Sequence, residues 1–142
     1  MAELLVNIDV SDLDRGISFY GGALGLQVGR RLGAKAVEML GASVAVYLLE
    51  CEPGTRPFQG AESERRYNRH WTPVHFDLVV TNIDAAVQRA VAGGATLEGQ
   101  VEDRAWGRLA RMSDPFGHGF CFVEFRGKGY DELVPTATRR SQ

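Results

Sequence analysis

The stretch "TPVHFDLVVTNID" at residues 72–84 repeats the character of "ELLVNIDVSDLD" at residues 3–14, at a constant offset of 70 positions. In each copy apolar and polar residues alternate and then give way to residues that begin helices. Alternation with a period of two predicts a strand with one apolar face. The repeat therefore predicts two copies of one structural unit, with His75 at the strand head of the second copy where the first has Leu5.

Each copy also carries a helix signal. Ser11 and Thr81 are expected N-caps, because an aspartate follows each of them three positions later in a pattern close to the capping box. Apolar residues then recur at helical spacing until Gly25 in the first copy and Gly93-Gly94 in the second. We expect one helix in each copy, directly after its first strand.

Strand-like segments separated by glycines follow each expected helix. They cover residues 26–32, 34–40 and 43–50 in the first copy and residues 96–102, 107–114 and 119–125 in the second. The predicted fold class is α+β, with two tandem βαβββ modules that pair into a curled mixed sheet around a shared cleft. The chain is expected to form one domain, with module one at 3–50, a linker at 51–73, module two at 74–126 and a tail at 127–142.

The composition argues against several functions. The chain has 142 residues and a net charge of −2, so we expect no nucleic-acid partner. Its apolar runs are shorter than the roughly 18 residues that span a bilayer, and the N-terminus lacks a secretory signal, so we expect no membrane partner. The two cysteines, Cys51 and Cys121, suggest no disulfide framework, which fits the reducing cytoplasm as the expected location.

Two longer motifs carry a resemblance to a known family. These are "VNIDVSDLDRGISFYGGALGLQV" at residues 6–28 and "RMSDPFGHGFCFVEF" at residues 111–125, which contains a DP-x-G turn and a last strand. With them the chain resembles the vicinal oxygen chelate superfamily, which includes glyoxalase I, extradiol dioxygenases, fosfomycin-resistance enzymes and bleomycin-resistance proteins. The resemblance covers about residues 4 to 126 and implies the fold more specifically than the reaction.

The resemblance also implies where a metal would bind. Catalytic members hold a divalent metal through His and Glu side chains from the first and last strands of each module. The matching positions in this chain are Leu5, Tyr47, His75 and Cys121, so His75 alone is a typical ligand of that family. Leucine cannot coordinate, and a tyrosine phenol rarely gives up its proton because its pKa is near 10. Glu50 and Glu124 lie three residues past these positions, an odd step that places them on the helix-facing side or at the strand end.

We therefore expect a small-molecule-binding protein without a cofactor, similar to the metal-free bleomycin-resistance proteins. The expected ligand-binding residues are Leu5, Asn7, Tyr47, His75, Asp77, Trp106, Arg108 and Cys121. One alternative is a lyase, isomerase or dioxygenase with a divergent Zn, Ni, Mn or Fe site around His75. Another is a metal-free enzyme in which Asp77 orients His75 as a general base. No catalytic residue is assigned, and the resemblance implies a homodimer.

Several of these residues have a plainer interpretation. Trp106 with Arg108 or Arg111 could hold a planar or anionic ligand, or these could be a sheet-edge tryptophan and solvent-exposed arginines. Cys121 could be a small core residue between phenylalanines. The segment "RRYNRHW" at residues 65–71 could fold over the cleft or be an ordinary surface loop, and His118 in the DP-x-G turn suggests no role of its own.

Overall fold

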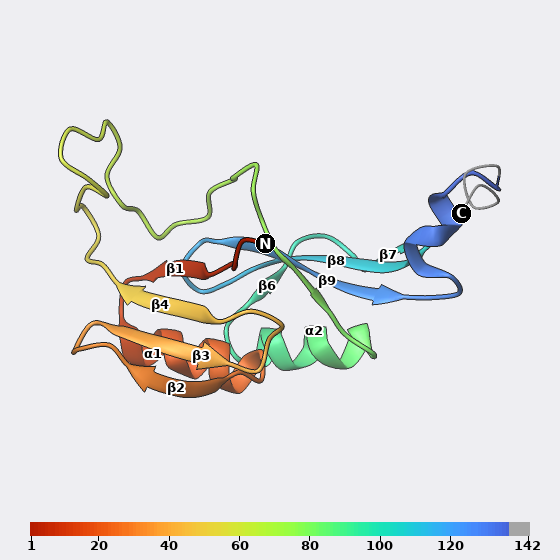
Figure 1. Cartoon of the computed structure of the whole chain (residues 1–142), viewed down its shortest axis with the longest axis horizontal. Helices are drawn as coiled ribbons and strands as arrows, with labels where there is room; N and C mark the ends of the chain where they lie inside the picture. Colours follow the sequence, from red (N-terminus) through yellow and green to blue (C-terminus); the bar gives the residue numbers. More distant parts are fainter. Residues whose placement is uncertain (137–142) are drawn as a thin grey trace.

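The computed structural model describes residues 1–136, and the six residues after them lie outside the description. Its first half follows the expected β-α-β-β-β order (Figure 1). The elements are β1 (Val6–Val10), α1 (Leu13–Ile17), a π-helical continuation η1 (Ser18–Ala23), β2 (Gln27–Arg31), β3 (Ala36–Leu40) and β4 (Val46–Glu50). Within residues 1–136 no helix combines the length and the apolar character that crossing a bilayer requires.

The second half repeats this order with one additional strand. Its elements are β5 (Asp77–Val79), α2 (Ile83–Ala92), β6 (Thr96–Leu97), β7 (Glu102–Arg104), β8 (Gly107–Ser113), β9 (Gly119–Phe125) and a 3-10 turn η2 (Gly129–Leu133). The strand expected over 96–102 is wrong, because Gly99 takes a φ of +87° and divides it into β6 and β7. Strand β7 instead forms a hairpin with β8.

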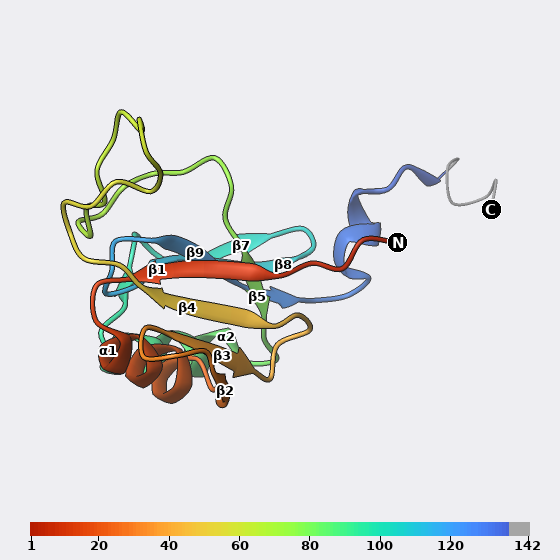
Figure 2. The ribbon, with the colours of Figure 1, turned by 60° about the vertical axis from the view of Figure 1, so that its left-hand side comes forward.

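Among residues 1–136 the strands form two separate mixed sheets, ordered β1-β4-β3-β2 and β5-β9-β8-β6, with β7 pairing to β8. The α+β class is confirmed, but the expected single curled sheet is not formed. No ladder joins β1 to β5 among the described residues, because a groove separates β1 from the chain that leads into β5. Helices α1–η1 and α2 lie side by side on one side of the two sheets (Figures 1 and 2).

The strand register aligns the two modules. The parallel ladders pair Asn7 with Tyr47 in the first sheet and Asp77 with Cys121 in the second. Asn7 and Asp77 are related by the 70-residue repeat, so Tyr47 and Cys121 occupy equivalent places. Equivalent positions of the two sheets therefore carry different chemistry.

The helix N-caps lie one residue later than expected. Asp12, and not Ser11, caps α1 by accepting a hydrogen bond of 2.9 Å from the Arg15 amide. Asn82, and not Thr81, caps α2 by accepting one of 3.0 Å from Ala85. Serine, threonine, aspartate and asparagine all cap helices, so two adjacent candidates leave the first residue of the helix ambiguous in the sequence.

A glutamate at the end of a strand satisfies a second amide of each helix. The Leu13 amide donates to Glu50 Oε2 at 2.9 Å, and the Ile83 amide donates to Glu124 Oε2 at 2.9 Å. Both glutamates thus turn toward the helices, which is one of the two placements that the odd step in the sequence allows. The same device in both modules ties the last strand of each sheet to its helix.

The core is shared between the modules. Phe19 on η1 packs edge-on against Phe120 on β9, with ring centroids 6.4 Å apart, and Phe76 stacks on Phe120 at 5.8 Å. The buried Tyr20 hydroxyl donates a hydrogen bond to Asp114, which belongs to the turn before β9. Module one and module two therefore bury their apolar faces against each other.

Candidate functional site

A groove runs between β1 and residues 70–76, where the two modules meet. Its cavity volume is about 610 Å³. The apolar wall consists of Leu4, Leu5, Val74 and Phe76, and the polar groups that reach it include Asn7, Thr72 and His75. Small-molecule sites typically combine apolar walls with a few converging polar groups.

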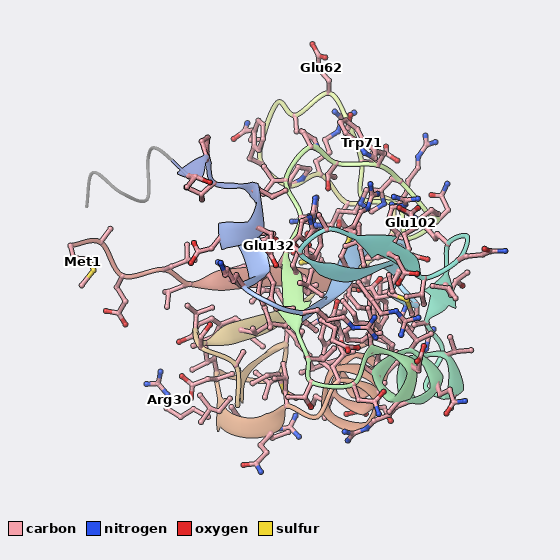
Figure 3. The ribbon with its side chains drawn as sticks, turned by 90° about the vertical axis from the view of Figure 1, so that its right-hand side faces the viewer. Met1, Arg30, Glu62, Trp71, Glu102 and Glu132 are labelled. Atoms are coloured by element: carbon pink, nitrogen blue, oxygen red, sulfur yellow. The ribbon has the colours of Figure 1, made fainter. Side chains whose placement is uncertain are left out.

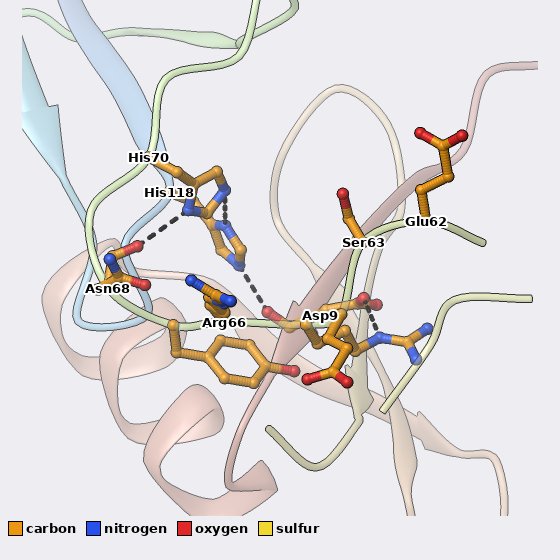
Figure 4. Close-up of a pocket in the computed structure, with 10 residues that line it drawn as sticks. Asp9, Glu62, Ser63, Arg66, Asn68, His70 and His118 are labelled. Atoms are coloured by element: carbon orange, nitrogen blue, oxygen red, sulfur yellow. Dashed lines mark hydrogen bonds and ion pairs between the residues drawn. The ribbon is translucent and has the colours of Figure 1, made fainter. Parts of the chain in front are cut away.

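The groove continues into a more polar cavity of about 810 Å³, which we call the polar end. It is lined by residues 62–68 of the long connecting loop, and it shares Asp9, His70 and His118 with the groove (Figure 4). Glu62 marks the tip of this loop, far from Arg30 on the first sheet (Figure 3). Basic and acidic side chains both line the polar end, so it is polar without a single dominant sign of charge.

The structure brings together part of the set that the sequence predicts. Leu5 and Asn7 from module one meet His75 from module two in the groove. Tyr47 lies on the same face of its sheet as Asn7, but its hydroxyl donates to Glu38 Oε2 at 3.2 Å. It does not line the groove in this structure.

Asp77 and Cys121 lie directly beside His75. His75 Nδ1 is 3.3 Å from Asp77 Oδ1, and one donor atom of each of the three side chains lies within 4.8 Å of the other two. Nitrogen, carboxylate and thiolate donors are the ligands that Zn²⁺ takes in proteins. These three residues could hold a metal through module two alone. The superfamily's ligand positions in this module supply only two of the donors, His75 and Cys121, and Asp77 adds the third.

The Cys121 thiol is held in its neutral form. Burial raises its pKa to about 11, and the negative charge and hydrogen bond of Asp77 add to the effect. Cys121 is only 8% exposed. A neutral thiol is a poor nucleophile, so this cluster is not arranged as a cysteine-based catalytic group. A metal would have to displace the proton to bind the sulfur.

Module one carries an ion pair where module two carries the donor cluster. Arg30 Nε donates to Glu38 Oε1 at 3.1 Å and Arg30 Nη2 donates to Glu38 Oε2 at 2.8 Å. These hydrogen bonds, with that from Tyr47, lower the pKa of Glu38 to about 2 against the cost of its desolvation. Glu38, Tyr47 and Asn7 form one row across the first sheet.

Trp106 and Arg108 lie away from the groove. The Trp106 ring packs against Phe125 and Tyr130, with centroids 6.0 and 5.1 Å away. Arg108 Nη1 pairs with Asp84 Oδ2 on α2 at 3.0 Å, so its side chain faces the helix. The sheet-edge tryptophan is therefore the arrangement found, and the arginine is engaged in ion pairs.

Arg111, and not Arg108, lies near His75. It pairs with Cys121 across β8 and β9, and the two residues line a small cavity of about 130 Å³ together with His75 and Glu98. Arg111 differs from Arg108 by three positions, and this odd step reverses the face of the strand. Strand parity was the signal that could have distinguished the two arginines.

His70 and His118 are the site residues that the sequence did not indicate. His118 Nδ1 lies 3.4 Å from His70 Nε2, although the residues are 48 positions apart (Figure 4). The segment at 65–71 does not close over the groove as a lid. It is docked on both modules, because Arg65 Nε pairs with Asp9 Oδ2 on β1 at 2.8 Å, while the His70 amide donates to the Gly117 carbonyl at 3.2 Å and Arg69 Nε pairs with Glu98 Oε2 at 2.6 Å.

A comparison with protein families finds a match over most of the chain. A family model described as a glyoxalase-like domain matches residues 5–123. The uncharacterized protein Mb0911c of Mycobacterium bovis is 50% identical over 48 residues, which are 33% of this chain and 32% of that protein. The chain therefore spans about a third of the length of the curated relative.

Solved structures with the same fold include a fosfomycin resistance protein and an antibiotic-binding protein. The fosfomycin resistance protein FosX from Listeria monocytogenes matches with a TM-score of 0.70 and 17% identity, over 94% of this chain and 98% of that one. TnmS3, an antibiotic-binding protein from Streptomyces sp. CB03234, matches with a TM-score of 0.60 and 20% identity, over 89% of this chain and 97% of that one. At these identities the likeness shows the fold alone.

Proposed function

The chain belongs to the glyoxalase-like domain family of the vicinal oxygen chelate superfamily, and on this premise we propose that it binds a small organic molecule in the groove between β1 and residues 70–76. The observation that carries the proposal is that Leu5 and Asn7 of one module converge with His75 of the other on a cavity of about 610 Å³. This volume lies in the range of roughly 300–1,000 Å³ that is usual for small-molecule sites.

The residues at the superfamily's own ligand positions support binding without a metal there. Leu5 and Tyr47 occupy two of the four metal-ligand positions of the superfamily; leucine has no donor, and the tyrosine hydroxyl is directed to Glu38. The names of the structural neighbours, an antibiotic-binding protein and a fosfomycin resistance protein, support an antibiotic-like small molecule as the class of ligand.

A thermal-shift screen tests this proposal. A ligand that raises the melting temperature of the native chain should lose most of its effect in Leu5→Ser. The matched control is Leu32→Ser, because Leu32 is 45% exposed and Leu5 is 50% exposed, yet Leu32 lies outside the groove. Equal ligand shifts in the two variants would contradict the placement of the site.

A second function is favoured by the His75, Asp77 and Cys121 cluster. These donors support a divergent metal centre, with Zn, Ni, Mn or Fe, and a lyase, isomerase or dioxygenase activity. Metal analysis of protein purified without a histidine tag separates the two functions. About one metal per chain that is lost in His75→Ala would establish the centre, and metal content that does not depend on His75 would leave the groove as a pocket.

We also propose a homodimer in the cytoplasm. The helices cover one side of the sheets (Figure 2), and apolar side chains on the other side are open to solvent, including Leu40 at 44% and Val79 at 63% exposure. Burying them against a second copy would remove apolar area from water. Light scattering should give the mass of two chains, and Val79→Lys should reduce it to one. The free thiols of Cys51 and Cys121 support a reducing compartment.

A further inference from the structure

The histidine pair at the boundary between the groove and the polar end has a fixed arrangement of protons. His118 Nε2 is 2.7 Å from the Asp9 carbonyl oxygen, and His70 Nδ1 is 3.0 Å from the Asn68 carbonyl oxygen (Figure 4). A carbonyl oxygen only accepts hydrogen bonds, so each of these ring nitrogens carries a hydrogen. In a neutral imidazole the remaining nitrogen then has a lone pair.

The two remaining nitrogens face each other. His118 Nδ1 and His70 Nε2 are 3.4 Å apart. Two acceptors at this distance have no hydrogen between them while both rings are neutral, so the arrangement favours a positively charged species that both lone pairs can share. Either a proton or a metal ion could serve, but the separation of 3.4 Å is longer than the roughly 2.7–3.2 Å of a usual hydrogen bond and so favours the metal ion.

We propose that His70 Nε2 and His118 Nδ1 together bind a divalent transition-metal ion, Zn²⁺ or its neighbours Ni²⁺ and Cu²⁺. Two ligands at tetrahedral Zn–N bonds of about 2.0–2.1 Å lie about 3.3–3.4 Å apart, which matches the separation found here. Metal-bound histidines usually donate their other ring N–H to a carbonyl or carboxylate, and both of these rings do so. Imidazole is a ligand that suits these three metals.

The protein holds the two rings in place through close backbone contact. Asp114 Oδ1 accepts hydrogen bonds from the amides of Phe116 and His118, at 2.8 and 2.9 Å, and so shapes the turn that carries His118. A Cβ on Gly117, whose φ is +83°, would lie 2.2 Å from the Asn68 carbonyl oxygen. The loop that carries His70 can therefore pack against this turn because residue 117 is glycine.

The rest of the coordination shell is open. Among residues 1–136 no aspartate, glutamate or cysteine completes a group of three donors with these two nitrogens. Both cavities reach the pair, so water or a donor atom of a bound molecule would fill the remaining positions. The inference does not depend on the proposed function, and it uses neither His75 nor Cys121.

Histidine NMR on the untagged 142-residue chain tests the proposal directly. The chain has three histidines, so ¹⁵N labelling of the rings gives a spectrum with few signals. Before metal is added, His118 should be the Nε2–H form and His70 the Nδ1–H form. Addition of Zn²⁺ should then shift the Nδ1 signal of His118 and the Nε2 signal of His70. Zinc shifts confined to His75, or none at all, would overturn the proposal.

Calorimetric titration with Zn²⁺ and Ni²⁺ supplies the second measurement. The starting protein is the His75→Gln/Cys121→Ser variant, which lacks two donors of the neighbouring cluster. Asparagine at 70 and glutamine at 118 keep a hydrogen-bond donor near the positions of His70 Nδ1 and His118 Nε2, and remove the facing nitrogens. Adding His70→Asn/His118→Gln should weaken binding at least about tenfold. Unchanged affinity, or no binding by the starting protein, would contradict the site.

Discussion

The reactivity of Cys121 is limited first by its burial and then by the Asp77 carboxylate. Burial and the Asp77 carboxylate both disfavour the thiolate, which raises the pKa of the thiol to about 11. In a Cys51→Ser protein, alkylation of Cys121 by iodoacetamide should be slow at pH 8, because the thiolate is the reacting form. Asp77→Asn removes the nearby negative charge, so the pKa should fall and the reaction should become several-fold faster.

The pH dependence of the alkylation rate is the measurement that checks this expectation. Its midpoint should move to lower pH in Asp77→Asn. The control is Asp84→Asn, which removes a carboxylate that pairs with Arg108 on the helix side of the sheet. An unchanged midpoint in Asp77→Asn would mean that burial alone sets the reactivity of this thiol.

Glu38 links stability to pH through its contact with Arg30. Because the folded-state pKa is lowered from 4.5 to about 2, the carboxylate stabilises the fold fully above pH 4.5, and this contribution is lost as pH falls toward 2. Glu38→Gln should therefore be less stable than the native protein at pH 7. The difference should shrink between pH 4.5 and 2.

Urea denaturation of both proteins at pH 7, 4.5, 3 and 2 tests this coupling. The two curves of unfolding free energy against pH should converge at the acid end. Parallel curves would show that the substitution acts through packing and not through the charge. Arg30 is largely exposed, so the effect should also decrease at high salt.

Among the secondary-structure elements, the last strand of each module is connected to the first turn of its helix by a glutamate, Glu50 or Glu124. Glu124→Ala would leave the partly buried Ile83 amide without its acceptor, at a cost of about 1–3 kcal/mol. Glu50→Ala should have a similar cost through Leu13. Chemical denaturation of the two alanine variants measures both values.

Glutamine variants separate the cap from the surrounding charges. Glu50 and Glu124 also lie near Lys35 and Arg126, at 3.8 and 3.4 Å. Glutamine removes the charge but retains an oxygen that can accept from the helix amide. We expect it to retain more than half of the stability that alanine loses. Equal losses for alanine and glutamine would assign the effect to the ion pairs.

The bounds of a strand could be predicted from the sequence where its apolar pattern has no interruption. The run at 119–125 is a strand over that whole range, and Phe120 to Val123 are buried in succession with no glycine to interrupt them. The run at 96–102 contains Gly99, and its positive φ interrupted the strand. The helix starts were displaced by one residue because Ser11 and Thr81 precede equally capable caps.

Residues of the candidate site could be predicted only where the 70-residue repeat relates a position of one module to a position of the other. The 70-residue offset was sufficient to relate Leu5 to His75, and both line the groove. The approach of His70 to His118 depends on the path of a long loop and on the absence of a side chain at Gly117. No local pattern encodes a contact of that kind between a loop and a distant turn.

At the scale of the whole molecule, the shared aromatic core makes the two modules one unfolding unit. Phe120 contacts Phe19 of module one and also Phe76 and Phe122 of module two. Phe120→Ala should destabilise the protein by about 3–5 kcal/mol, the usual cost of removing a buried phenylalanine ring. Because both modules lose contacts, the loss should lower a single transition and should not create an intermediate.

Two spectroscopic probes test whether unfolding is a single transition. Tryptophan fluorescence reports on Trp71 and Trp106, and far-UV circular dichroism reports on the sheets and helices of both modules. Their urea midpoints should coincide in the native protein and in Phe120→Ala. The matched control is Phe58→Ala, which removes a phenylalanine that is 68% exposed on the connecting loop and should change stability by less than about 0.5 kcal/mol. Separate midpoints for the two probes would mean that each sheet and its helix remain folded without the other.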